Sequence, residues 1–457
     1  MGIFAVQKLM KELNGELMRK GYVTSQIVAP EQSLATGTLR LMVIPGKVHA
    51  VTYAKGSVEV PWRNSFPIRE GDILNIRMLE QGLEQMKRIS SQDVTMKLIP
   101  STVPGETDVE LMVTRGKQLH MGVSLDDSGL ENTGKLQLSS TLGIDSIFNA
   151  SDKLSINIHG DGAQSGYHKG TRGYGVNYSI PFGRDTFSVG HNHYTYHQTV
   201  AMGISPFISS GKTDTSIFSW DHMVSRNDTN KWAWDIKIAK RHSHSYINDY
   251  EIEVQEQQTT SFETGYSVRS YIGSKTLYAR TALRYGVGWF DAQPDWDIPD
   301  APRTRYTMGL LDIDYQVPFT MGHRSASFTT SFHGQWTGGS KRLLGSDTIS
   351  IGNRYTVRGF DGDNTLMGES GWYIKNELAS AVKAIHGEIY IGLDVGAVYG
   401  PSTDMLVGRT IVGAVLGARG AIGKHGTYDV FVGTPIYKPE GYRTAKVTSG
   451  FTVGLHF

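Results

Sequence analysis

Histidines at alternate positions are the residues of this sequence best placed to bind a metal ion. His191, His193 and His197 lie close together, and His242 and His244 repeat the spacing of two. In an extended strand such residues share one face, so neighbouring imidazoles can reach one ion. However, no nearby carboxylates are patterned to complete a catalytic set, and histidines are common at loop edges. We therefore predict no metal site and no cofactor.

Other kinds of functional site lack the residues that they need. The chain contains no Cys, which excludes cysteine nucleophiles, disulfides and thiolate metal sites. It contains no Gly-x-Ser-x-Gly nucleophile motif and no phosphate-binding loop. Basic and acidic residues nearly cancel, 45 against 44, so the composition offers no excess charge for a nucleic-acid backbone. We predict neither an enzyme nor a nucleic-acid-binding protein.

The composition instead fits a transmembrane β-barrel. Gly accounts for 53 of the 457 residues and aromatic residues for 10%, whereas Gly usually makes up about 7%. No apolar run approaches the roughly 18 residues of a membrane-spanning helix. This excludes helical membrane proteins but leaves barrels possible, because their alternating strands average to polar.

From Gln118 to the C-terminus, sixteen segments alternate apolar and polar residues between turns rich in Gly, Asp, Asn and Ser. The last segment is the clearest, because its apolar residues all fall on one face of a strand. These residues are Val447, Phe451, Val453, Leu455 and Phe457. The pattern predicts an all-β transmembrane barrel of 16 antiparallel strands over residues 118–457.

Charged residues of both signs share the opposite face of several segments. In a soluble sandwich, the alternative, that face would meet bulk water, but sixteen strands are unusual for one such domain. Mixed charges on one face and aromatic residues on the other favour a hydrated lumen and a lipid-facing wall. The residues predicted to line this lumen are Asp235, Lys237, Arg280, Arg284 and Glu388.

Before residue 118, helical and strand periodicities mix, which predicts small α+β modules. Residues 1–46 combine a helix at 3–20 with a hairpin of strands at 26–29 and 38–44. This order resembles the back half of a module, so we expect the chain to begin inside a domain.

Residues 47–117 are predicted to form a complete module of the same kind. A strand at 48–55 precedes a helix at 75–88, and two further strands follow at 94–99 and 108–114. Strand, helix and paired strands in this order can bury one small core.

Four short motifs occur in order along this pattern. Residues 21–25 read Gly-Tyr-Val-Thr-Ser, with 30–34 and 37–39 close behind, and residues 125–129 read Leu-Asp-Asp-Ser-Gly. Later, Val-Arg-Gly-Phe and Gly-Leu-Asp-Val-Gly occur at 357–360 and 392–396. Together they resemble the two-partner secretion transporters of the outer membrane (TpsB family), members of the POTRA-barrel superfamily. The resemblance covers essentially the whole chain.

This resemblance implies that a long sixth loop, at about residues 336–370, folds back into the lumen. There Arg358 would pair with Asp394, a loop latch that the alternation supports because it turns Asp394 inward. The glycines Gly392 and Gly396 share that face and leave room for a guanidinium, which suits bidentate pairing. The alternative is a solvated loop arginine and an unrelated lumen acid. The loop motif also contains Val357, Gly359 and Phe360, and the terminal Phe457 would be the assembly signal.

The family exports a large exoprotein, such as a haemolysin, a filamentous adhesin or a contact-dependent growth inhibition toxin. The implied partners are the N-terminal domain of that exoprotein, outer-membrane lipid and the barrel assembly machinery, with the transporter a monomer. The implied location is the outer membrane, with residues 1–117 in the periplasm. An assembly insertase of the same superfamily is the alternative, and a plain porin is disfavoured by those residues. The plug helix usual in the family is not found in this sequence.

Overall fold

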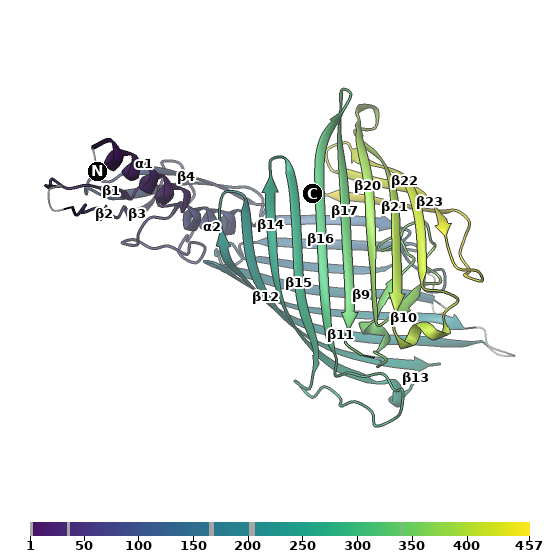
Figure 1. The fold of residues 1–457 in the computed structure, drawn as a ribbon. Coiled ribbons are helices and arrows are strands. Elements are labelled where there is room, and N and C mark those ends of the chain that lie inside the picture. The colour runs from purple at the N-terminus through teal and green to yellow at the C-terminus, as the bar shows by residue number, and fades with distance from the viewer. Residues whose placement is uncertain (1–2, 34–36, 164–168, 201–205, 340) are drawn as a thin grey trace.

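The computed structural model describes residues 3–33, 37–163, 169–200, 206–339 and 341–457. Two small N-terminal units are followed by a closed barrel, and the units lie to one side of the barrel in Figure 1. Neither helix within these described residues is long and apolar enough to cross a membrane.

Sixteen long strands make up the barrel wall, as the sequence predicts. They are β6 (Leu119–Asp126), β7 (Gln137–Asp145), β8 (Lys153–Asp161), β9 (Lys169–Phe182), β10 (Asp185–Val200), β11 (Phe207–Arg226), β12 (Asn230–Ile247), β14 (Gln257–Ile272), β15 (Lys275–Val287), β16 (Thr307–Met321), β17 (Arg324–Thr337), β20 (Ser370–Val382), β21 (Gly387–Tyr399), β22 (Thr410–Ile422), β23 (Gly426–Tyr437) and β24 (Thr448–His456). A two-residue strand, β13 (Tyr250–Glu251), extends the β12–β14 connection.

Each long strand pairs with its sequence neighbours in antiparallel register, and β24 closes the barrel on β6. This closing pair is short and runs from Thr452 opposite Asp126 to His456 opposite Gly122. Closure leaves no free edge in the wall, so all of its strands can satisfy their backbone groups internally.

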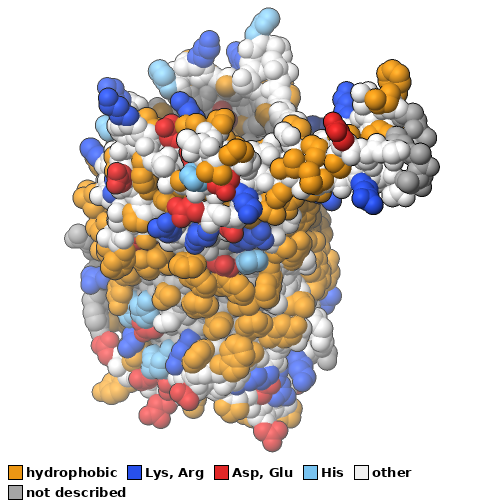
Figure 2. All heavy atoms as spheres, turned by 90° about the vertical axis from the view of Figure 1, so that its left-hand side faces the viewer, with side chains coloured by type: hydrophobic (Ala, Val, Ile, Leu, Met, Phe, Trp, Pro, Cys, Tyr) orange, Lys and Arg blue, Asp and Glu red, His pale blue; other side chains and the backbone are white. Residues whose placement is uncertain are grey.

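The outer wall carries the apolar side chains of the alternation. Val189, Leu283, Ile391 and Leu416 lie on different strands and are each between 46% and 58% exposed. Figure 2 shows hydrophobic side chains gathered in a band across the middle of the barrel, with charged and histidine side chains above and below it. Such a band matches the apolar belt of a barrel embedded in lipid.

The first unit contains α1 (Ile3–Arg19), β1 (Gln26–Val28) and β2 (Met42–Ile44). The predicted strand at 38–44 is therefore wrong in its first half. The side-chain amide of Gln32 binds both backbone groups of Arg40 at 2.7 Å, which gives that backbone a local alternative to strand pairing.

The second unit consists of β3 (Lys47–Tyr53), α2 (Ile76–Lys87), β4 (Gln92–Pro100) and β5 (Glu106–Arg115), with sheet order β3-β5-β4. Asn75 caps the N-terminus of helix α2, and its side chain accepts a hydrogen bond from the backbone N–H of Arg77. Phe66, Leu79 and Leu111 are fully buried between helix and sheet. The unit thus has a core of its own, as its helix and strand order predicts.

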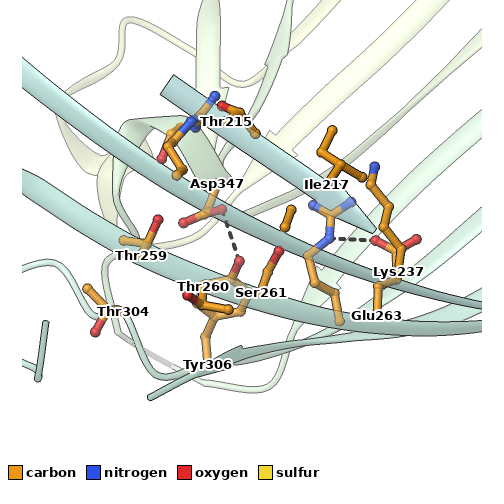
Figure 3. A pocket seen from close by; sticks show the side chains of 14 residues that line it. Thr215, Ile217, Lys237, Thr259, Thr260, Ser261, Glu263, Thr304, Tyr306 and Asp347 are labelled. Atoms are coloured by element: carbon orange, nitrogen blue, oxygen red, sulfur yellow. Dashed lines mark hydrogen bonds and ion pairs between the residues drawn. The ribbon is translucent and has the colours of Figure 1, made fainter. Parts of the chain in front are cut away.

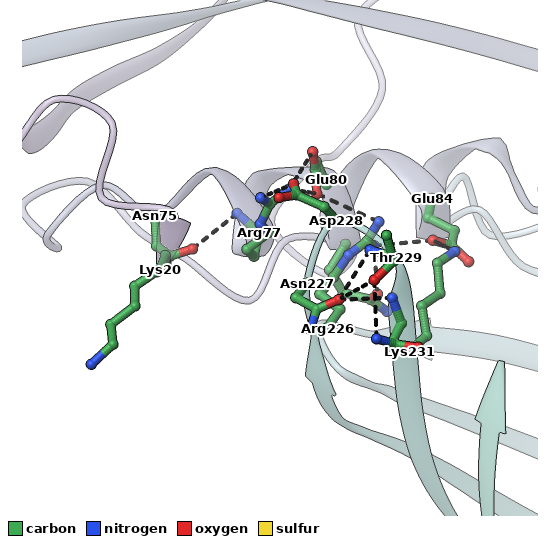
Figure 4. A network of polar contacts seen from close by, with 12 residues as sticks. Lys20, Asn75, Arg77, Glu80, Glu84, Arg226, Asn227, Asp228, Thr229 and Lys231 are labelled. Atoms are coloured by element: carbon green, nitrogen blue, oxygen red, sulfur yellow. Dashed lines mark hydrogen bonds and ion pairs between the residues drawn. The ribbon is translucent and has the colours of Figure 1, made fainter. Parts of the chain in front are cut away.

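Helix α2 docks on the barrel through an acidic face (Figure 4). Glu84 accepts hydrogen bonds from Arg226 of β11 at 3.0 Å and Lys231 of β12 at 2.5 Å, and Arg77 pairs with Asp228 in the turn between these strands. Burial raises the pKa of Glu84, but Lys231 and Arg226 outweigh it and hold the pKa below its ordinary value. The junction is therefore stabilised at neutral pH and weakens as the pH falls through that lowered pKa.

Candidate functional site

The candidate site lies where the sixth connection at the end of the barrel far from the α2 junction folds back into the lumen. This connection joins β17 to β20, and its described residues, 338–339 and 341–369, are called loop 6. It contains η3 (Gly345–Asp347), β18 (Ile349–Ile351) and β19 (Leu366–Gly368), and the two short strands pair with each other.

Arg358 of loop 6 and Asp394 of β21 form a forked ion pair. The guanidinium Nε lies 2.7 Å from Asp394 Oδ2 and Nη2 lies 3.0 Å from Oδ1. The backbone N–H of Arg358 also donates to Oδ2 at 3.0 Å. Asp394 is fully buried and Arg358 is 9% exposed. Because three donors of one residue converge on one carboxylate, both side chain and backbone of the loop are fixed there.

The pair extends into a charged network that sequence patterning did not identify. Arg358 Nη1 lies 2.6 Å from Glu377 of β20, which also pairs with Arg419 of β22 at 2.8 Å. Arg419 in turn contacts the predicted lumen residue Glu388. Glu377 lies two positions after Lys375 and shares its inward face of β20, and this spacing could have revealed it as a lumen acid.

Three glycines of the two motifs allow the loop to approach the wall. Gly359 has a φ of +99°, and a Cβ there would lie 2.5 Å from the carbonyl oxygen of Thr434. A Cβ on Gly392 would lie 2.5 Å from Arg358 Nη2, and one on Gly396 would lie 2.9 Å from Val357. Any side chain at these positions would push the loop off the wall.

Apolar residues of the same motif seal loop 6 against the wall. Val357 and Phe360 are buried with Ile351 of β18, and the cluster includes Ile411 of β22 and Tyr442 from the β23–β24 connection. Phe360 and Tyr442 meet edge to face with ring centroids 5.9 Å apart. Loop 6 is therefore held in place by one ion-pair network and by one small apolar cluster.

Arg354, a second arginine of loop 6, contacts residues beside the seam at which β24 pairs with β6. Its Nη1 lies 3.0 Å from Asp127, which belongs to the 125–129 motif, and its guanidinium stacks 5.0 Å from the ring centre of Phe431. Asp127 also accepts a hydrogen bond from the backbone of Phe451 in β24. The contact joins loop 6 to both β6–β7 and β24, and no spacing in the sequence reveals it.

Three predicted lumen residues and one further lumen acid form a separate network of ion pairs on β12, β14 and β15. Arg280 Nε lies 3.0 Å from Asp235, and its Nη2 lies 2.7 Å from Glu263. Glu263 also contacts Arg284 at 2.7 Å. Acids and bases thus pair across strands, which avoids a strong field of one sign along this wall.

Loop 6 meets this wall at a polar cavity of about 190 Å³ (Figure 3). Lys237 lines it, and Tyr306 from the β15–β16 connection donates a 2.9 Å hydrogen bond to Asp347 of η3. Burial raises the pKa of Asp347, and Tyr306 and two arginines only partly oppose it. A polar space of this size has room for several waters between loop and wall.

The C-terminal Phe457 lies at the seam between the first and last strands. Its backbone exchanges hydrogen bonds with Met121 of β6, at 2.8 and 3.1 Å, and its ring stacks on His425. Of the motif residues quoted above, Leu34 lies outside the described residues, so the structure gives no account of it.

This geometry holds a long loop inside a polar lumen through noncovalent contacts. The contacts are hydrogen bonds, ion pairs and apolar packing, and each can be broken without breaking a covalent bond. The arrangement therefore suits a conduit that can be obstructed and opened.

Comparison with protein-family models assigns residues 1–100 and 105–420 of the chain. The model described as haemolysin secretion/activation protein ShlB/FhaC/HecB matches residues 105–420. A POTRA domain model matches residues 47–100, and a POTRA domain of ShlB type matches residues 1–46.

Comparison with individual proteins gives the same picture. The chain is 38% identical over 457 residues to outer membrane transporter CdiB-2 of Burkholderia pseudomallei (strain 1026b), covering 99% of this chain and 78% of that protein. It superposes on CdiB from Escherichia coli with a TM-score of 0.90 at 24% identity, covering 100% of this chain and 85% of the other. BamA from Haemophilus ducreyi lacking POTRA domains 1–3 gives a TM-score of 0.53 at 12% identity, covering 100% and 94%. The BamA likeness concerns the fold alone.

Proposed function

This chain belongs to the haemolysin secretion/activation protein family ShlB/FhaC/HecB, and from this premise we propose that it exports one large partner exoprotein by two-partner secretion. It is an outer-membrane transporter with POTRA domains on the periplasmic side. The family consists of transporters rather than enzymes. The exoprotein would be a haemolysin, a filamentous adhesin or a contact-dependent growth inhibition toxin.

One observation carries the proposal: a buried ion pair, Arg358 with Asp394, holds loop 6 inside a closed barrel. The lumen walls pair acids with bases, as Arg280 does with Asp235 and Glu263. An exoprotein chain that slides through the lumen would meet no large excess of charge of one sign, so it would not be bound strongly enough to stall. Closure within one polypeptide supports a transporter that works as a monomer.

Secretion by co-expressed cells tests the function. A partner exoprotein, if it is encoded beside this gene, is expected to reach the medium only in cells that also produce this chain. An exoprotein that stays in the periplasm, although the barrel is folded in the outer membrane, would contradict export. If instead porin levels fall when the chain is removed, the insertase alternative is favoured, an outcome that the distant BamA likeness makes unexpected.

We propose that the periplasmic domains recognise the client, because they present an unpaired strand edge outside the membrane. In the sheet β3-β5-β4, strand β4 pairs only with β5 among the described residues. An extended client segment could add as a further strand along β4 by backbone hydrogen bonds. The edge of β3 is less open, since Val48 exchanges backbone hydrogen bonds with Gly71 and Asp72 and Lys47 pairs with Ile73.

Disulfide trapping is expected to place the client on β4. Because the chain has no Cys, Lys97→Cys on the exposed edge strand gives one unique thiol. It should form a mixed disulfide with a client whose N-terminal domain carries a single cysteine, as seen on a non-reducing gel.

Lys55→Cys is the matched control, since Lys55 is also exposed but lies in the turn after β3. Equal trapping at both positions would contradict docking on β4. Deletion of residues 47–115 should also abolish capture of the client domain in a pull-down. Undiminished capture would place recognition at the barrel.

A further inference from the structure

Two histidines and two glutamates meet on the outer wall at the far end of β12. His242 and His244 alternate with the lumen-facing residue Arg241, and their ring centroids lie 4.2 Å apart. His242 Nε2 lies 2.7 Å from Oε1 of Glu256, the residue directly before β14. His244 Nδ1 lies 2.5 Å from Oε1 of Glu251 in β13. The connection between β12 and β14 thus folds its acids back onto the imidazoles.

The spacing of these donor atoms suits a metal ion. One ligand atom each from His242, His244 and Glu256 lies within 4.8 Å of the other two, and no other such group occurs within the described ranges. The three side chains are partly exposed, at 34%, 17% and 45%, so small rotations can bring them to the 2.0–2.2 Å bond lengths of zinc. Access from solvent is open.

We propose that this cluster binds one divalent transition-metal ion of the zinc class, with His242, His244 and Glu256 as ligands. Two imidazoles and one carboxylate favour zinc, nickel or copper over calcium and magnesium, which prefer oxygen ligands. Glu251 is a positioning residue: it accepts the Nδ1 proton of His244 and leaves Nε2 free to bind the metal. The sequence analysis did not pair these histidines with Glu251 and Glu256, because the glutamates follow the histidines across a turn.

This site is separate from the latch, because it faces away from the lumen. Bound metal would tie β12 to the β12–β14 connection at the cell-surface end of the barrel. A neighbouring pair gives an internal comparison: His193 lies 2.8 Å and His191 3.5 Å from Asp214. That group does not bring three donor atoms within 4.8 Å of one another, so we expect it to bind zinc far more weakly.

Zinc titration of the tag-free chain in detergent tests the site, with a chromophoric chelator as competitor. We expect one zinc per chain, and zinc-edge X-ray absorption should show two imidazole ligands. H242A/H244A should weaken binding at least about 100-fold and Glu251→Gln about 10-fold to 100-fold, whereas H191A/H193A should leave it unchanged.

Folding of each variant is checked by its heat-modifiable mobility on a gel, and Glu256→Gln gives a second, conservative loss of a ligand. Absence of saturable zinc binding would overturn the proposal. So would unchanged binding by H242A/H244A, or an equal loss in H191A/H193A.

Discussion

Replacing Arg358 with alanine should abolish export of the partner exoprotein while the barrel still inserts into the outer membrane. The change leaves Asp394 fully buried with its main charged partner gone. Breaking a buried pair typically costs about 3–5 kcal/mol, which would shift the loop from docked to undocked by a factor of about 100 or more. Exoprotein in the medium is the measurement, and Asp394→Ala should behave in the same way.

Arg409→Ala is the matched control for this prediction. Arg409 also pairs with an aspartate, Asp404, but both side chains are at least half exposed, where pairs contribute little. Export by this variant should equal that of the parent. Normal export by the Arg358 and Asp394 variants, with both shown to be folded, would mean that the pair is not needed for transport.

Removing loop 6 should raise the conductance of the barrel several-fold in a planar bilayer. The contacts that hold loop 6 inside the barrel include the latch at Asp394, the seam contact of Arg354, and the hydrogen bond that Tyr306 donates to Asp347. A short Gly-Ser linker can replace residues 341–368, because Thr337 and Ser370 already lie within hydrogen-bond distance. The remaining lumen is lined by charged side chains and should fill with water.

Shortening the β12–β14 connection by residues 250–255 provides the control, since its histidine contacts lie on the outer wall. That variant should conduct like the parent chain. Equal conductance of the parent and the loop 6 deletion, both with heat-modifiable barrels, would show that loop 6 does not obstruct the lumen.

The wall of the barrel could be predicted from the sequence because side-chain direction in a strand depends only on position. Once Asp235 and Arg280 are assigned to the polar face of their own strands, both must face the lumen. The strand at 38–44 was predicted less well, because the side chain of Gln32 binds the backbone of Arg40. A local competitor of this kind leaves no periodic signal.

The same reasoning predicted only part of the candidate site. Motifs placed Arg358 beside Asp394, and alternation independently turned Asp394 inward. Glu377 and Arg354 were missed, although each contacts a motif residue. The partners of Arg354 and of His242 come from other strands and connections, and periodicity along one strand says nothing about these.

The sequence by itself determined that this chain forms a sixteen-stranded barrel with a charged lumen and an apolar outer wall, since both follow from a period of two. Only the tertiary structure decided which charges meet. Asp127 and Arg354 are separated by 227 positions in the chain, and Glu251 reaches His244 only because a short connection turns back. Such contacts depend on strand register and on the path of each loop, and these are set by the packing of the whole barrel rather than by any local run of residues.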